Sequence, residues 1–180
     1  IMGPVEEFLT GDSSLGYGEA AVGGTFVRIG VGTVRKPVEE RYQRFKTYEI
    51  VDPGTWTIET GPDRITFVHV LKSDQGYAYE YRKTIRLEGA SLHLDHRLRN
   101  TGSQPIATSV YNHNFFTLDR QVTGPDVSVR FPFTLKPARD MADRAAVKGS
   151  EIAYLKTLAP GETAFTELAG FGPTAADYDI

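Results

Sequence analysis

Residues 92–116 read LHLDHRLRNTGSQPIATSVYNHNFF, and this stretch decides the fold class. Apolar and polar side chains alternate through Leu92–Leu98, with His96 on the leucine face, which is the pattern of an antiparallel strand with one buried face. The turn residues Asn100-Thr101-Gly102-Ser103 follow, and strand composition returns in Ile106–Phe116. We therefore expect the two runs to pair as a hairpin.

Short runs of strand composition, separated by turn residues, recur along the rest of the chain. They are Thr25–Val34, Phe45–Asp52, Thr55–Thr60, Arg64–Leu71, Tyr77–Leu87, Val127–Val129, Phe131–Leu135, Glu151–Leu155 and Glu162–Leu168. Gly30 and Gly32 interrupt the first run, which predicts a bulge or a close approach by another group. The glycine-rich residues 1–24 read as an irregular loop, and Met141–Lys148 is the only segment of helical composition. With no repeat or linker, the pattern predicts one all-β sandwich domain over residues 1–180.

Composition narrows the classes of partner and chemistry. The 180 residues carry a formal net charge of -3, so neither nucleic acid nor an anionic membrane is favoured as a partner. No apolar run approaches the roughly 20 residues that span a bilayer. The chain has no cysteine, which excludes disulfides, thiolate nucleophiles and zinc–thiolate sites but indicates no compartment. Because the first residue is Ile1 and not Met, we expect an upstream segment to have been removed.

The candidate site is the run Ser109–Asp119, which places Asn112, His113 and Asn114 among aromatic rings. Buried amides and imidazoles need hydrogen-bond partners, so such a strand is expected at a sheet end or along a polar cavity. Rings beside directional donors suit a sugar, whose C–H faces stack on aromatics while its hydroxyls form hydrogen bonds. His113 is the candidate acid or base, because an imidazole titrates near neutrality.

The other motifs point to no competing chemistry. His69 is interpreted as a packed or edge residue, His93 as solvent-exposed and His96 as a core histidine. The histidine spacings give no metal-ligand set, so we expect no metal site. The chain lacks GxSxG and a strand–GxGxxG–helix pattern, which leaves serine-esterase and dinucleotide-binding functions without support.

Two motifs resemble the galactose mutarotase-like (aldose 1-epimerase) family. In that family an N-T-G-x-x-P turn leads into an N-H-x-Y/F-F-x-L strand, and here Leu98–Pro105 and Tyr111–Leu118 have the same order and spacing. Gly76-Tyr77 before the run 78–87 resembles the family's GYPG approach to a similar strand. The resemblance covers residues 20–135.

The resemblance implies a supersandwich of antiparallel strands with a sugar or glycan site on its concave face. It implies that His113 protonates the ring oxygen during anomer interconversion, while a carboxylate takes the proton of the C1 hydroxyl. Asn112, Asn114 and Phe115 are then substrate-binding candidates. The chemistry requires no metal or cofactor.

Two departures from the family pattern leave alternatives open. The stretch Ile29–Lys36 lacks the family's earlier histidine, so Arg35 or Lys36 is the candidate for binding a sugar oxygen or an anionic substituent. Asp177 and Asp179 resemble the family's aspartate-bearing segment, but the family's catalytic glutamate lies beyond it, and this chain stops at Ile180. We therefore expect either a fragment of the sandwich or a chain without that base.

Three functions follow as alternatives: an epimerase-like enzyme, a carbohydrate-binding module without turnover, or a polysaccharide-processing enzyme on a similar sandwich. A truncated sheet would also expose an unpaired strand edge, which predicts a homodimer.

Overall fold

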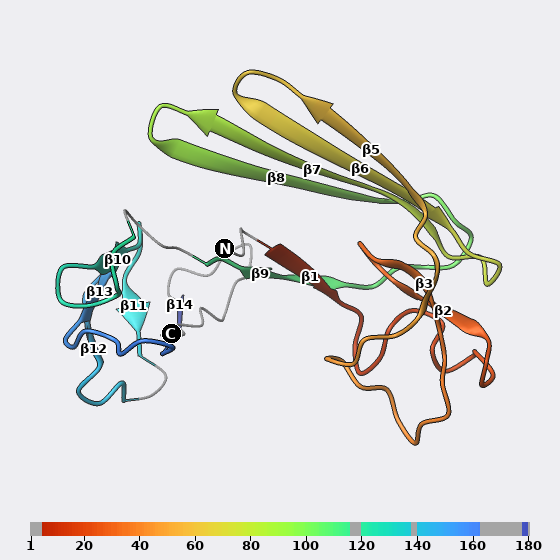
Figure 1. Ribbon diagram of the computed structural model, residues 1–180, viewed down its shortest axis with the longest axis horizontal. Helices are drawn as coiled ribbons and strands as arrows, with labels where there is room; N and C mark the ends of the chain where they lie inside the picture. Colours follow the sequence, from red (N-terminus) through yellow and green to blue (C-terminus); the bar gives the residue numbers. More distant parts are fainter. Residues whose placement is uncertain (1–4, 116–119, 138–139, 163–177, 180) are drawn as a thin grey trace. The chain divides into compact units, whose positions relative to one another are not determined.

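The computed structural model describes residues 5–115, 120–137, 140–162 and 178–179, all of them strand, turn or loop (Figure 1). The predicted all-β class is confirmed, and no helix in these residues is long and apolar enough to cross a membrane. The chain divides into two compact units, residues 1–115 and 116–180. The supersandwich type, the single domain over 1–180 and the homodimer stay predictions.

The first unit contains three sheets. The largest has the order β5 (Thr55–Thr60), β6 (Arg64–Lys72), β7 (Ala78–Glu88), β8 (Ser91–Asn100), with antiparallel neighbours throughout. The second has the order β2 (Thr25–Arg28), β3 (Gly32–Arg35), β4 (Ile50–Asp52), and the third pairs β1 (Val5–Leu9) with β9 (Ser109–His113).

The second unit contains a three-stranded antiparallel sheet and a short parallel pair. The sheet has the order β10 (Ser128–Arg130), β13 (Glu151–Tyr154), β12 (Ala145–Lys148), and β11 (Leu135–Lys136) lies parallel to β14 (Tyr178–Asp179). The helical prediction for Met141–Lys148 is wrong, because its second half is strand β12. Gly149 adopts a φ of 62° in the turn that follows, and the β12–β13 hairpin pairing overrides the helix propensity of Ala and Lys.

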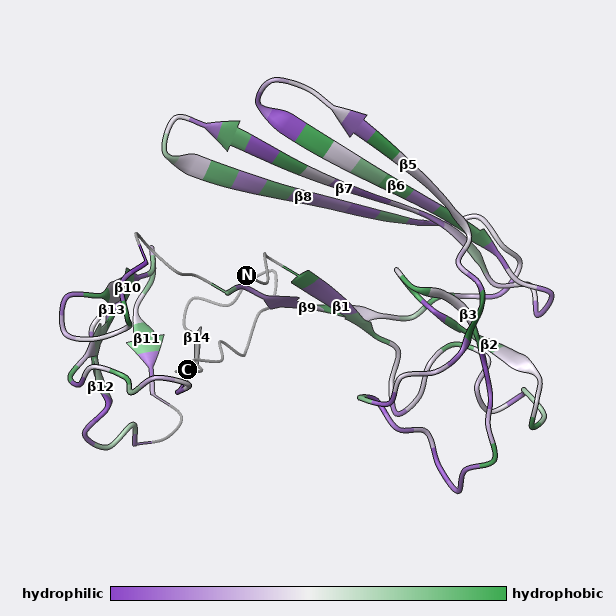
Figure 2. Cartoon of the chain, viewed as in Figure 1, coloured by the Kyte–Doolittle hydropathy of each residue, from purple (hydrophilic) through white to green (hydrophobic). Residues whose placement is uncertain are grey.

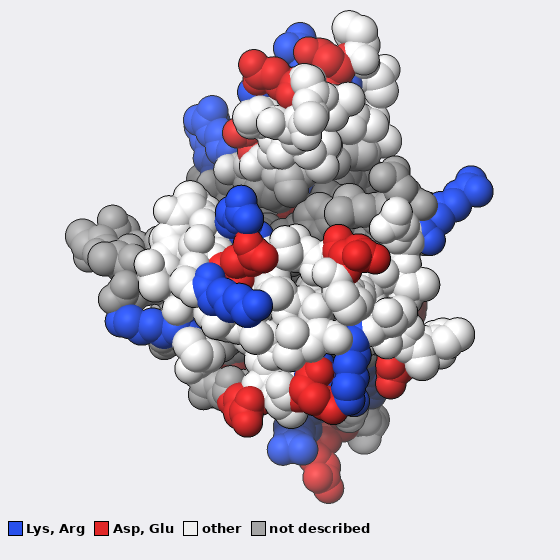
Figure 3. Space-filling model, turned by 90° about the vertical axis from the view of Figure 1, so that its left-hand side faces the viewer, with Lys and Arg blue, Asp and Glu red and all other residues white. Residues whose placement is uncertain are grey.

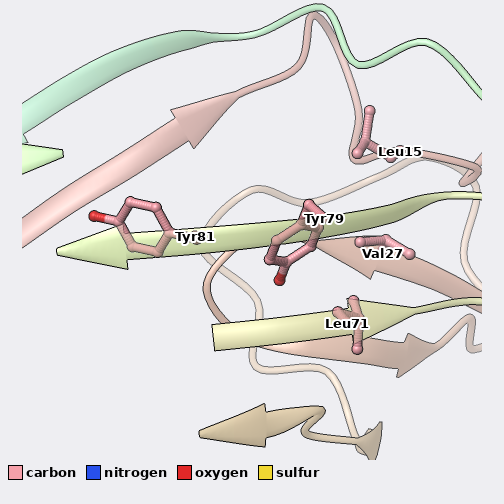
Figure 4. Close-up of a cluster of buried hydrophobic side chains, with 5 residues drawn as sticks. All are labelled: Leu15, Val27, Leu71, Tyr79 and Tyr81. Carbon is pink, nitrogen blue, oxygen red and sulfur yellow. The ribbon is translucent and has the colours of Figure 1, made fainter. Parts of the chain in front are cut away.

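The apolar face of the large sheet carries one core cluster of the first unit, and another includes Phe26, Val34 and Tyr48. Hydrophobic and hydrophilic residues alternate along β6–β8 (Figure 2), so one face is apolar and the other polar. At one end of the apolar face, Leu71, Tyr79 and Tyr81 pack against Leu15 and Val27 (Figure 4). Leu87 and Leu92 at the other end of the same face, and Ile58 on the edge strand β5, remain more than half exposed, at 56%, 52% and 59%.

The predicted hairpin between Leu92–Leu98 and Ile106–Phe116 is wrong. Strand β8 pairs with β7, while β9 pairs with β1, so that Val5 faces His113. The backbone N–H groups of Thr101 and Gly102 instead donate to the carbonyl of Ala78, at 3.0 and 3.1 Å. The turn therefore folds back on the β6–β7 connection and directs the chain away from β8.

Two further predictions for the N-terminal half need correction. Residues 1–24 are not wholly irregular, because Val5–Leu9 forms β1, whose partner strand lies too far along the chain to leave a local signal. The run Thr25–Val34 is two strands joined by a turn at Gly30, which has a φ of 80°. The close approach predicted there is confirmed at Gly32, where a Cβ atom would lie 2.2 Å from the carbonyl oxygen of Asp52.

Candidate functional site

A cavity of about 190 Å³ lies in the first unit, between β1, the loop that follows it and the β2–β3 hairpin. Its lining residues include charged and aromatic ones that can bind or stack on a ligand, among them Glu6, Glu7, Arg28, Arg44, Trp56 and Tyr81. A second hollow of about 290 Å³ shares Glu7, Arg28, Val31 and Arg44 with it. The two hollows therefore adjoin along the wall that these residues form.

Glu6 is the centre of a hydrogen-bonded network on the cavity wall. The Tyr81 hydroxyl donates to its Oε1 at 2.6 Å, and the Lys83 ammonium donates to its Oε2 at 2.5 Å. The Tyr81 oxygen also lies 2.8 Å from Nδ1 of His96. Because the single phenolic proton goes to the carboxylate, Nδ1 of His96 must carry the proton that it shares with Tyr81.

The network keeps Glu6 ionised. Burial raises the pKa of this carboxyl group, but the hydrogen bonds from Lys83 and Tyr81 outweigh burial and leave the pKa below its ordinary value. Burial and the neighbouring Glu6 carboxylate raise the pKa of Tyr81, so the hydroxyl keeps its proton. A carboxylate with a lowered pKa is a weak base, but its unused lone pairs accept hydrogen bonds from hydroxyl donors.

Glu7 and two arginines form the wall between the hollows. The Arg44 guanidinium donates to both Glu7 oxygens, at 3.0 and 2.7 Å. Hydrogen bonding to Arg44 holds the pKa of Glu7 below its ordinary value, and the charges of Arg28 and His113 lower it further. Arg28 donates to the backbone carbonyls of Arg44 and Lys46, which fixes its guanidinium in place.

Trp56 supplies the flat ring of the cavity. It is 44% exposed and stacks on His69, with centroids 4.2 Å apart and planes 5° apart. His69 is fully buried and neutral: Nε2–H donates to the Pro53 carbonyl at 2.9 Å, and Nδ1 accepts from the Tyr79 hydroxyl at 3.1 Å. Burial lowers the pKa of His69, so the interpretation of this residue as packed is confirmed.

His113 lies among rings, not among amides. Phe115 stacks on it at 4.2 Å, and Tyr111 meets it edge-on at 5.5 Å. Asn112 lies on the opposite side of β9, and both Asn112 and Asn114 are exposed. His113 therefore contacts Phe115 and lies close enough to Glu7 to lower the pKa of that carboxyl group, but it does not lie beside Asn112.

The remaining predicted binding residues lie elsewhere. Arg35 forms an exposed ion pair with Glu49, at 2.7 Å. The Lys36 ammonium donates to the carbonyls of Tyr17 and Ala20, at 2.8 and 2.9 Å, and neither Arg35 nor Lys36 lines the two hollows. Asp177 is outside the described residues, as is the side chain of Asp179, whose backbone belongs to β14.

Sequence reasoning missed Glu6, Trp56 and Tyr81. One available signal was the register of the β7–β8 hairpin, which turns at Gly89 with a φ of 58°. Counting back from that turn places Lys83 opposite His96 and Tyr81 opposite Leu98, on one face of the sheet. Glu6 reaches the network only through the β1–β9 pairing, which the local sequence does not reveal.

Comparisons with known proteins add no assignment: no family model, no curated protein and no solved structure matches this chain. Within residues 5–115, 120–137, 140–162 and 178–179, no three or more His, Asp or Glu side chains gather as metal ligands.

Proposed function

We propose that the first unit binds a single sugar ring in the cavity lined by Glu6, Trp56 and Tyr81. The observation that carries the proposal is the half-exposed Trp56 ring, which lines the same cavity as the Glu6 and Glu7 carboxylates. A pyranose needs this combination, because its C–H face stacks on a ring and its hydroxyls donate to acceptors. The resemblance of residues 98–118 to the mutarotase-like family points to the same ligand class.

The size and charge of the cavity favour binding of one ring. Its volume of about 190 Å³ is smaller than the about 300–1,000 Å³ of pockets that hold drug-sized ligands. The lowered pKa of Glu6 favours hydrogen-bond acceptance over proton abstraction. Binding of one sugar ring, with Glu6 as a hydrogen-bond acceptor and not as a catalytic base, is therefore the function that this geometry supports best.

Isothermal titration calorimetry with a panel of aldoses tests the proposal. Trp56→Ala removes the stacking surface, and Glu6→Gln removes the charged acceptor while keeping the shape of the side chain. Ile58→Ala is the matched control, because Ile58 lies on the same face of β5, is 59% exposed and does not line the cavity. We expect Trp56→Ala and Glu6→Gln each to weaken binding about tenfold or more, and Ile58→Ala to leave it unchanged. Equal binding by all three variants, or no binding of any aldose by the parent protein, would overturn the proposal.

Anomer interconversion is the second candidate, and the position of His113 favours it. His113 lines neither hollow, but it lies on the same side of the β1–β9 pair as Glu7, which lines the cavity. Polarimetry of freshly dissolved aldoses tests it. We expect faster anomerisation with the parent protein than in buffer, and loss of that acceleration in His113→Ala with little change in melting temperature. If the parent protein gives the buffer rate, the first unit binds without turnover.

A further inference from the structure

The second hollow differs from the first in its charge. It is lined by three cationic residues, Arg28, Arg44 and Lys46, and by one carboxylate, that of Glu7. On the face of the molecule in Figure 3, by contrast, basic and acidic side chains intermingle without a large patch of one sign. A concave surface with surplus cations attracts anions, because low-dielectric walls focus its potential.

Two of the three cations are already neutralised by carboxylates. Arg44 binds Glu7 through both oxygens, and Lys46 donates at 2.8 Å to Glu39, whose side chain is only 3% exposed. None of the ion pairs between described residues includes Arg28. Arg28 is therefore the cation of this hollow that has no ion-pair partner among the described residues.

Arg28 is also held in a binding-competent position. Nη1 and Nη2 each donate to a backbone carbonyl, at 3.2 and 3.0 Å, and the guanidinium lies 6.0 Å from the centre of the Tyr48 ring. A guanidinium has five N–H donors, so three remain for a ligand. Carboxylate and phosphate groups match such a planar fork, and a fixed fork loses little entropy on binding.

We propose that the second hollow is an anion subsite in which Arg28 binds the carboxylate or phosphate of an acidic sugar whose ring occupies the neighbouring cavity. The position of the sugar ring in this inference rests on the proposed function, whereas the binding of the anion by Arg28 does not. Arg28, Val31 and the Glu7–Arg44 pair line both hollows, so an anionic group in the second hollow and a ring in the first would contact the same residues. The preferred ligand class is then a sugar acid or sugar phosphate, not a neutral sugar.

Titration calorimetry with four probes tests the proposal: glucose, glucuronic acid, glucose-6-phosphate and inorganic phosphate. We expect at least one of the two acidic sugars to bind about tenfold to hundredfold more tightly than glucose, and added salt to reduce only that advantage. The two acidic sugars distinguish a carboxylate from a phosphate specificity. Glucose serves as the neutral reference, and inorganic phosphate reports the anion subsite alone.

Two variants locate the subsite. Arg28→Gln removes the positive charge of the guanidinium, and Val31→Glu adds a negative charge at a 38% exposed turn position without touching the Arg28 hydrogen bonds. Val31→Gln is the uncharged reference for Val31→Glu. Arg97→Gln is the general control, because Arg97 is an exposed cation on β8 that lines neither hollow. We expect Arg28→Gln and Val31→Glu to abolish the preference for acidic sugars and Arg97→Gln to retain it.

Failure of the two proposals can be told apart. If glucose and the acidic sugars bind equally well, the anion subsite is overturned and the sugar cavity stands. If inorganic phosphate binds as tightly as glucose-6-phosphate and glucose does not bind, the sugar cavity is overturned and the anion subsite stands. If none of the four probes binds, both proposals are overturned.

Discussion

Removing one hydroxyl group, in Tyr81→Phe, tests the network around Glu6. The ring of Tyr81 is 3% exposed, so phenylalanine keeps its packing and loses only the bonds of the oxygen. One of these bonds, at 2.6 Å, goes to the Glu6 carboxylate and the other, at 2.8 Å, joins Nδ1 of His96. The variant thus isolates the contribution of the hydroxyl to stability.

The magnitude follows from the two bonds. A hydrogen bond to a charged group contributes about 1.5–3 kcal/mol and a neutral one about 0.5–1.5 kcal/mol. Since Glu6 keeps Lys83 as a partner, we expect Tyr81→Phe to lower the free energy of unfolding by about 2–4 kcal/mol. A packing effect alone would be much smaller, because the volume of the ring is conserved.

Urea denaturation followed by tryptophan fluorescence measures this change. Trp56 is the only tryptophan of the chain and belongs to the first unit, so its signal reports the unfolding of that unit. Tyr77→Phe is the matched control, because Tyr77 packs on the same core cluster and its hydroxyl forms no hydrogen bond with another described residue. We expect the control to change the free energy by less than about 0.5 kcal/mol. Equal losses in the two variants would refute the assigned network.

Three further predictions concern the same unit. Because burial lowers the pKa of His69 in the folded state, the unfolded state takes up a proton at a higher pH than the folded state does. We therefore expect the urea midpoint to fall as the pH is lowered through about 6.5. A midpoint that does not change with pH would contradict the neutral, buried imidazole. Glu39 accepts hydrogen bonds from two tyrosine hydroxyls and a lysine ammonium. We expect Glu39→Ala to lower the free energy of unfolding by about 2–4 kcal/mol in the same assay, and Glu40→Ala, at the exposed neighbouring residue, to leave it almost unchanged. Gly54→Ala would place a Cβ atom 2.6 Å from Nε2 of His69, whereas Gly11, which has a similar φ, has no atom within 4 Å of its Cβ position. We therefore expect Gly54→Ala to lower the melting temperature more than Gly11→Ala. Similar losses in the two variants would show that backbone strain, and not the contact with His69, causes the destabilisation.

The strands of the large sheet could be predicted from the sequence because their signals are local. Thr55–Thr60 was predicted with the bounds that β5 has, and β6, β7 and β8 were placed to within a few residues. Alternation and turn residues mark each strand over a short stretch of chain. They do not identify the partner strand, because the same signals predicted that Leu92–Leu98 pairs with Ile106–Phe116, whereas β8 pairs with β7.

The candidate site could not be predicted in the same way, because its parts come from distant segments. Glu6 meets Tyr81 across 75 positions, and the sequence of β1 around Glu6 does not identify its partner strand. The composition of the run around His113 predicts a binding strand, yet strand geometry separates Asn112 from the imidazole. Composition identified one strand near the site, and long-range pairing determined which side chains line the cavity.

The pairing of β1 with β9 also affects how the protein is made. Val5 can find His113 only after nearly the whole first unit has left the ribosome, whereas the β5–β8 hairpins can form as they emerge. Because closing so long a loop is slow, we expect the segment that carries Glu6 to join last and its carboxylate to reach Tyr81 and Lys83 at the end of folding. Nascent chains arrested before residue 109 should therefore hold a formed β-meander that has no ligand affinity.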